Sequence, residues 1–272
     1  MTALITFAFR TVPLAAVLIV ATSRGACAQD DVADVPDKTY RIADSSKLLY
    51  VQIGPPADAQ PPADGYKLLL VLPGGDGSRD FLPFVKRISK YALPEGYIVA
   101  ELIAPQWSKR QQAVWPTEKK PEQGMKMSTE KFMTAVVADV ASRHKLDRRH
   151  VFALAWSSGG PAVYAASLTE KTPITATMPA MSIFYPGMFP PLENARGHAY
   201  FLLHSPQDTV CKYALAERAV RDLTAAGATV KLLDYEGGHG WRGDVFGNIR
   251  AGVAWMEEQT ADSNGPAAAA AQ

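Results

Sequence analysis

The stretch "VFALAWSSGGPAVYAASL", Val151 to Leu168, runs from a strand-like apolar segment through two serines and two glycines into an alanine-rich helical segment. A buried strand that leads directly into a helix is the repeating unit of parallel α/β sheets. Strand-like and helical patterns also occur earlier in the chain. "YKLLLVLP" (66–73) is typical of a strand buried on both faces, and 128–140 has helical spacing. The sequence therefore predicts an α/β fold with a mostly parallel central sheet and helices on both faces.

Three segments with different roles are expected along the chain. Residues 1–28 carry Arg10, an apolar run and Ala26-Cys27-Ala28, which together predict a cleaved signal peptide and a secreted or periplasmic protein. The apolar run of 12 residues (11–22) is short of the roughly 20 needed to span a bilayer, so no stable membrane anchor is expected after cleavage. Residues 29–260 predict a single α/β domain, and 261–272 predict a disordered tail.

The charge balance excludes some partners. Of the 28 Lys and Arg residues, two lie in the predicted signal peptide, which leaves 26 basic against 27 acidic residues in the mature chain. Nothing in this balance favours nucleic acid. Cys27 leaves with the signal peptide, so Cys211 has no intrachain partner; it can be a nucleophile, but a packing residue is favoured.

Three residues of catalytic type directly follow predicted strands. Ser157 follows "HVFALAW", Asp208 follows "AYFLLHSPQ" and His239 follows "TVKLLDYEGG". Ligands of parallel sheets bind at the carboxyl ends of the strands, so these side chains are expected to meet, with His239 as base and Asp208 as its orienting acid. Asp234 and Asp244 are weaker candidates for the acid. The alternative is that Ser157 and Ser158 merely cap a helix.

Two backbone amides are predicted to stabilise a developing oxyanion. The first belongs to Ser158, at the start of the helix that follows the nucleophile. The second is expected in the glycine-rich turn "VLPGGDGS" (71–78), where the amide of Gly75 is the best candidate and that of Asp76 the next. A phosphate-binding loop is disfavoured, because the turn lacks the lysine and Ser/Thr of that motif.

The segments "LPGGDGS", "AWSSGG", "HSPQDTV" and "GGHGW" resemble those of the α/β-hydrolase superfamily over nearly all of the mature length. The similarity is greatest to the esterase branch with dienelactone hydrolases, phospholipase/carboxylesterase-type enzymes and polyhydroxybutyrate depolymerase-like proteins. This resemblance implies the α/β-hydrolase fold, an acyl-enzyme on Ser157 and no cofactor. It departs from the G-x-S-x-G motif at Ala155, and dienelactone hydrolases carry cysteine in place of Ser157.

Long connections and tryptophans suggest where a substrate binds. The connection 105–127 is longer than a compact fold needs and is predicted to form a wall of the substrate site; a second long connection begins at Phe184. An aromatic pocket is predicted from Trp107, Trp115, Trp156 and Trp241, with core packing as the alternative for each. No histidine pair has metal-ligand spacing, so no metal site is predicted.

These features predict a serine hydrolase that acts on small-molecule or polymeric carboxylic esters. Two alternatives remain open: a serine peptidase of the prolyl-oligopeptidase type and a catalytically inactive binding protein with the same fold. The first would ordinarily carry a large extra domain, for which the chain has no room.

Overall fold

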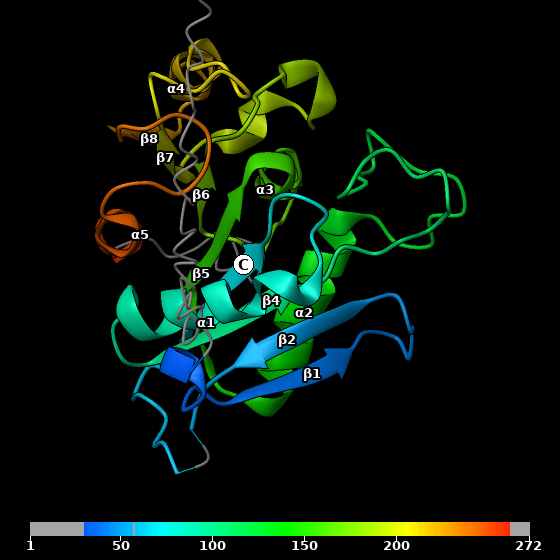
Figure 1. The fold of residues 1–272 in the computed structure, drawn as a ribbon, viewed down its shortest axis with the longest axis vertical. Coiled ribbons are helices and arrows are strands. Elements are labelled where there is room, and N and C mark those ends of the chain that lie inside the picture. The colour runs from blue at the N-terminus through cyan, green and yellow to red at the C-terminus, as the bar shows by residue number, and fades with distance from the viewer. Residues whose placement is uncertain (1–29, 57, 262–272) are drawn as a thin grey trace, which may run out of the picture.

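A computed structural model describes residues 30–56 and 58–261 (Figure 1). The predicted signal peptide and all of the predicted tail except Ala261 lie outside these residues. Eight strands of the described chain form one sheet in the order β1-β2-β4-β3-β5-β6-β7-β8. The strands are β1 (Asp37–Arg41), β2 (Leu49–Ile53), β3 (Tyr66–Leu72), β4 (Tyr97–Leu102), β5 (Leu146–Trp156), β6 (Ala176–Ala180), β7 (Ala199–His204) and β8 (Thr229–Asp234). The helices are α1 (Leu82–Tyr91), α2 (Thr129–Arg143), α3 (Gly160–Ser167), α4 (Ala214–Ala225) and α5 (Val245–Thr260).

The sheet is mostly parallel, as the sequence predicts. From β4 through β3 and on to β8, each neighbouring pair of strands is parallel, whereas β2 pairs antiparallel with both β1 and β4. The carboxyl ends of β3, β5, β7 and β8 therefore point to one edge of the sheet. Segments that are far apart in the sequence meet at that edge.

Helices cover both faces of the sheet (Figure 1). Successive side chains of a strand point to opposite faces, so Leu68, Leu70 and Leu72 of β3 pack with α2 and α3. Leu69 and Val71 pack on the opposite face, with α1 and α5. α4 adds a third cluster with α3 and β7. None of the helices in the described part of the chain is both long and apolar enough to cross a bilayer.

One acidic side chain is buried in the sheet without a partner. Glu101 of β4 lies between Val51 of β2 and Val71 of β3 and is 0% exposed. Neither oxygen of its carboxyl group has a hydrogen-bond partner among the described residues. Burial raises the pKa of Glu101 to about 8; the charge of Arg79 opposes this change and that of Asp37 adds to it.

The raised pKa of Glu101 predicts that the free energy of unfolding decreases between about pH 4.5 and about pH 8. Over this range the unfolded chain has released the proton that the folded chain still holds, at a cost of about 3 kcal/mol near pH 7. Glu101→Gln is therefore expected to be more stable than wild type at about pH 8 and to lose this advantage near pH 5. Urea unfolding of both proteins at each pH measures this difference in stability. The variant Glu95→Gln, at an exposed position, is the control. Parallel pH profiles for Glu101→Gln and wild type would contradict the expectation.

Candidate active site

Ser157 lies at a strained turn between β5 and α3. Its φ angle is +50°, a left-handed conformation that is rare for a residue with a side chain. Glycine at positions 159 and 160 allows the turn to pack tightly against its neighbours. A Cβ on Gly159 would lie 2.5 Å from the carbonyl oxygen of Leu72 in β3, and one on Gly160 would lie 1.8 Å from Oγ of Ser182. Ser182 Oγ also donates a hydrogen bond to the carbonyl oxygen of Ser157 at 3.0 Å.

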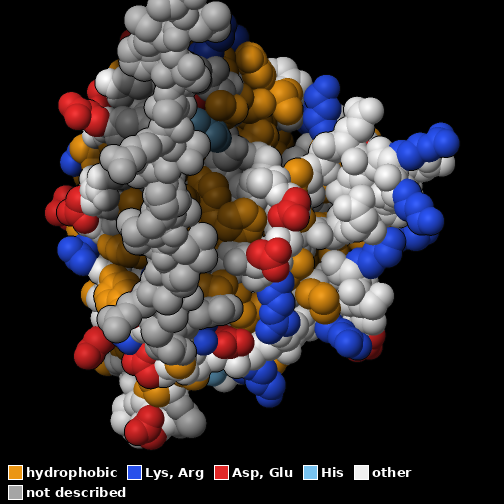
Figure 2. All heavy atoms as spheres, viewed as in Figure 1, with side chains coloured by type: hydrophobic (Ala, Val, Ile, Leu, Met, Phe, Trp, Pro, Cys, Tyr) orange, Lys and Arg blue, Asp and Glu red, His pale blue; other side chains and the backbone are white. Residues whose placement is uncertain are grey.

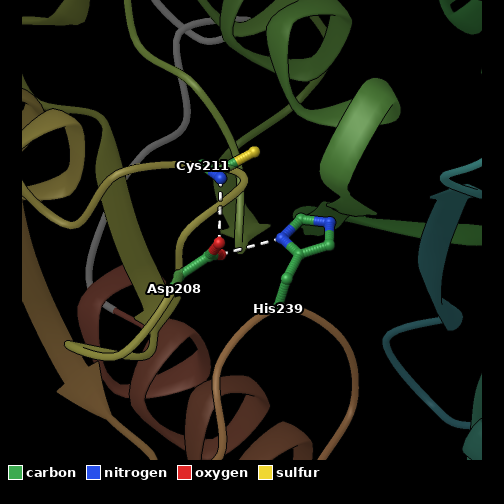
Figure 3. A group of neighbouring side chains, drawn as sticks. All are labelled: Asp208, Cys211 and His239. Carbon is green, nitrogen blue, oxygen red and sulfur yellow. Dashed lines mark hydrogen bonds and ion pairs between the residues drawn. The ribbon is translucent and has the colours of Figure 1, made fainter.

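The three residues predicted to act together form one hydrogen-bonded chain. Ser157 Oγ lies 3.1 Å from His239 Nε2, and His239 Nδ1 lies 2.8 Å from Asp208 Oδ2. Figure 3 shows the Asp208 carboxylate directed at the His239 ring. The side chain of Asp208 is fully buried, whereas that of His239 is 22% exposed. This geometry can take a proton from the serine hydroxyl and stabilise the resulting imidazolium.

Backbone donors hold the Asp208 carboxylate in place. Its Oδ1 accepts hydrogen bonds from the amides of Val210 and Cys211, both at 2.8 Å, and the second of these is drawn in Figure 3. His204, at the end of β7, lies 3.5 Å from Asp208 Oδ2 and donates from Nε2 to the carbonyl oxygen of Cys211 at 2.6 Å. Burial lowers the pKa of His204, which keeps this second histidine neutral.

The segments that carry the acid and the base are joined by hydrogen bonds. The amide of Gly238 donates to Ser205 Oγ at 3.1 Å, and the amide of Gly237 donates to Gln207 Oε1 at 3.3 Å. Ser205 Oγ in turn donates to Gln207 Oε1 at 2.8 Å. The position of His239 relative to Asp208 is therefore fixed by more than the bond between them.

The two weaker candidates for the acid have other partners. Asp234 accepts a hydrogen bond from the hydroxyl of Tyr213 at 2.7 Å. Asp244 is the N-cap of α5 and accepts from the amide of Gly247 at 2.9 Å. Asp208 is thus the carboxylate that contacts His239 in the described chain.

The glycine-rich turn after β3 lies against the serine turn. Ser158 Oγ donates to the carbonyl oxygen of Gly75 at 2.8 Å, and Gly75 has a φ angle of +61°. Within the described residues, neither the amide of Gly75 nor that of Ser158 donates to another protein group. Both amides are therefore free to donate hydrogen bonds to an oxyanion. Trp115 stabilises the turn, because its indole N–H donates to the carbonyl oxygen of Pro73 at 2.9 Å.

The four tryptophans do not form one pocket. Trp156 packs against Phe81, Phe84 and Trp241, with ring centroids 5.5 to 5.6 Å apart among these four aromatic side chains. This cluster lies on the α1 face of the sheet, because residue 156 of β5 points to that face. Trp107 is buried in the core on the opposite face. Only Trp115 of the four lines the cavity beside the serine turn.

That cavity has a volume of about 490 Å³, within the range of sites for small molecules. Part of the connection 105–127 forms one wall of this cavity, and its role as a wall of the substrate site stays a prediction. The segment after β6 forms another wall, where no site residue was predicted from the sequence. Apolar surface of the cavity comes from Val114, Trp115, Pro161, Ile183, Met188 and Phe189. Ser158, which follows the proposed nucleophile in the chain, also lines the cavity.

Cys211 lies beside the acid and the base (Figure 3). Possible metal ligand atoms of Asp208, Cys211 and His239 all lie within 4.8 Å of one another. Burial, and then the charge of Asp208, raise the pKa of the Cys211 thiol to about 11. The carboxylate and Nδ1 are already engaged in hydrogen bonds, and the buried thiol packs beside them.

Comparisons with known proteins identify the fold. The structure is similar to a fungal esterase from Rhizomucor miehei (15% identity, TM-score 0.62, 85% of each chain covered). It is also similar to Thermogutta terrifontis esterase 2 (14%, 0.61, 84% of this chain and 95% of the other) and to a Bacillus cereus carboxylesterase (15%, 0.55, 84% and 95%). No family model and no curated protein matches the sequence. The chain has the α/β-hydrolase fold.

Proposed function

We propose that the protein is a serine hydrolase that cleaves carboxylic esters through an acyl-enzyme on Ser157. The observation that carries this proposal is the chain of hydrogen bonds from Ser157 through His239 to Asp208, at 3.1 and 2.8 Å. The esterases with a similar fold support it. One of them, Thermogutta terrifontis esterase 2, is described as phosphorylated by paraoxon.

In the first half of the reaction, Ser157 Oγ attacks the carbonyl carbon of the ester while His239 Nε2 takes the hydroxyl proton. The carbonyl oxygen becomes an oxyanion, which the amides of Gly75 and Ser158 stabilise. Asp208 accepts a hydrogen bond from Nδ1, which stabilises the imidazolium. As the tetrahedral intermediate collapses, the C–O bond to the alcohol breaks and the alcohol leaves with the proton from Nε2.

Water completes the cycle. His239 takes a proton from a water molecule as its oxygen attacks the acyl carbon, and the bond to Ser157 Oγ then breaks. The serine regains its proton from Nε2 and the carboxylic acid is released. These steps use three side chains, two backbone amides and one water molecule, and no electron transfer occurs in any of them.

Ester turnover tests the proposal. The purified protein is expected to hydrolyse short p-nitrophenyl esters and to leave peptide p-nitroanilides largely intact. Faster cleavage of the anilides would favour a peptidase of the prolyl-oligopeptidase type. A folded protein that cleaves neither, yet binds an ester analogue, would be an inactive binding protein, and the proposal would then be wrong.

We also propose that the enzyme is exported to the periplasm or the medium. The composition of residues 1–28 supports this proposal. Mass spectrometry of the mature chain isolated from the natural host would test it, because cleavage is expected before Gln29. An N-terminus at Met1 in the mature protein would contradict it.

A further inference from the structure

The cavity beside Ser158 has an apolar interior and a basic rim. Trp115, Ile183 and Phe189 contribute apolar surface to it, and Lys119 and Lys120 line it as well. Apolar surface of this kind binds the body of a ligand, and a few charged groups fix its orientation. Since Ser158, the residue after the proposed nucleophile, also lines this cavity, the lining bears on the choice of ester.

The charge of the two lysines is not neutralised within the described chain. Lys119 and Lys120 are exposed, and neither side chain forms an ion pair or hydrogen bond with another described residue. The charge of Lys131, by contrast, is balanced by an ion pair with Glu118 at 2.9 Å.

Glu122 also lines the cavity, but its carboxylate is engaged with backbone amides. Glu122 Oε1 accepts hydrogen bonds from the amides of Gln112 and Ala113, at 3.0 and 2.8 Å. These bonds hold the carboxylate against its own connection, and among the described residues it forms no ion pair with either lysine. A negative group on a ligand would therefore meet uncompensated ammonium groups at the rim.

The connection that carries the rim is basic as a whole. Between residues 105 and 127 it holds five basic and two acidic side chains, whereas the full chain has a net charge of only +1. Figure 2 shows Lys and Arg side chains gathered on the lobe at the right, where Figure 1 places this connection. A local positive potential beside a catalytic site attracts anionic substrates and weakens as salt is added.

We propose that Lys119 and Lys120 make the site selective for esters that carry an anionic group on an apolar acyl or alcohol part. The apolar part fills the cavity, and the anionic group lies at the rim within reach of the two ammonium groups. This inference rests on the proposed function and specifies its substrate class. The apolar lining alone, from which neutral esters would be the expected substrates, does not account for the two lysines.

Two matched pairs of esters test the inference. Mono-4-nitrophenyl adipate and 4-nitrophenyl hexanoate differ by a carboxylate on the acyl part, and 4-acetoxybenzoate and its methyl ester differ by one on the alcohol part. Wild type is expected to show a higher kcat/KM for the charged member of at least one pair. The pair that shows the preference identifies the side of the ester that the cavity binds.

The variant K119Q/K120Q is expected to lower the charged-to-neutral ratio of kcat/KM by roughly three- to tenfold, mainly through KM. Raising the salt concentration from about 20 mM to about 500 mM is expected to lower the same ratio in wild type but not in this variant. Lys109→Gln is the matched control: Lys109 is exposed on the same connection but does not line the cavity, so the ratio should not change.

The outcomes separate this inference from the function on which it rests. If wild type cleaves the neutral esters but has no preference for the charged ones, the inference is wrong and the proposed function stands. If K119Q/K120Q loses kcat/KM equally for the charged and the neutral ester of a pair, the inference is also wrong, because that result indicates a structural role for the two lysines. If a folded wild type cleaves none of the four esters, both proposals fail.

Discussion

Ser157→Ala is expected to lower kcat for p-nitrophenyl esters by roughly 10⁵- to 10⁶-fold. The reason is that no other hydroxyl occupies the position 3.1 Å from His239 Nε2, so the acyl-enzyme cannot form. The free energy of unfolding should change little or increase, because alanine removes only one half-buried oxygen at a strained turn. Steady-state kinetics together with urea unfolding measure both effects.

The adjacent serine provides the matched control. In Ser158→Ala the amide remains, and only the hydrogen bond from Oγ to the carbonyl oxygen of Gly75 is lost. One neutral hydrogen bond contributes about 1 kcal/mol, so kcat should fall by no more than roughly tenfold. A larger loss in Ser158→Ala than in Ser157→Ala would reverse the roles assigned to the two serines.

Asp208→Asn is expected to lower kcat by roughly 10⁴-fold. The carboxylate accepts from His239 Nδ1, and it thereby keeps the lone pair of Nε2 directed at Ser157. An asparagine can present its N–H₂ group to Nδ1 instead, which favours the tautomer that carries the proton on Nε2. That tautomer cannot take the serine proton.

Asp234→Asn serves as the control for this change. Asp234 also follows a strand, but it accepts from Tyr213 and has no contact with His239. Its replacement should leave kcat within about threefold of wild type. Thermal unfolding of both variants separates a catalytic effect from a loss of fold, because Asp208 also accepts two backbone amides. Full activity in Asp208→Asn would remove this residue from the mechanism.

The fold and the meeting of Ser157, Asp208 and His239 could be predicted from the sequence for one physical reason. Parallel strands with helical connections place their carboxyl ends at the same edge of the sheet, so residues that follow different strands converge there. The two glycines after the serines permit the close approach of α3 to β3. The structure adds that the Cβ of a residue at 159 would lie 3.2 Å from the Cβ of Ala155. Glycine at position 159 therefore leaves room for alanine where the usual motif has glycine.

Trp156 could not be assigned to a face of the sheet from the sequence, because β5 is buried on both faces. In such a strand apolar residues occupy every position, and the pattern does not reveal which face each side chain takes. Trp156 thus packs with α1 although it precedes the proposed nucleophile. Ile183, Met188 and Phe189 line the cavity from an irregular segment that has no periodicity to read. Nothing in the local sequence indicated that the carboxyl group of Glu101 would lack a hydrogen-bond partner.

The central claim is that Ser157 is the nucleophile, and the site of covalent modification tests it most directly. The protein is incubated with paraoxon and digested, and the peptides are analysed by mass spectrometry. In the expected reaction Ser157 Oγ forms a bond to phosphorus, p-nitrophenolate leaves, and the adduct is absent from Ser157→Ala. An unmodified protein, or an adduct on Ser158 or another residue in place of Ser157, would contradict the account.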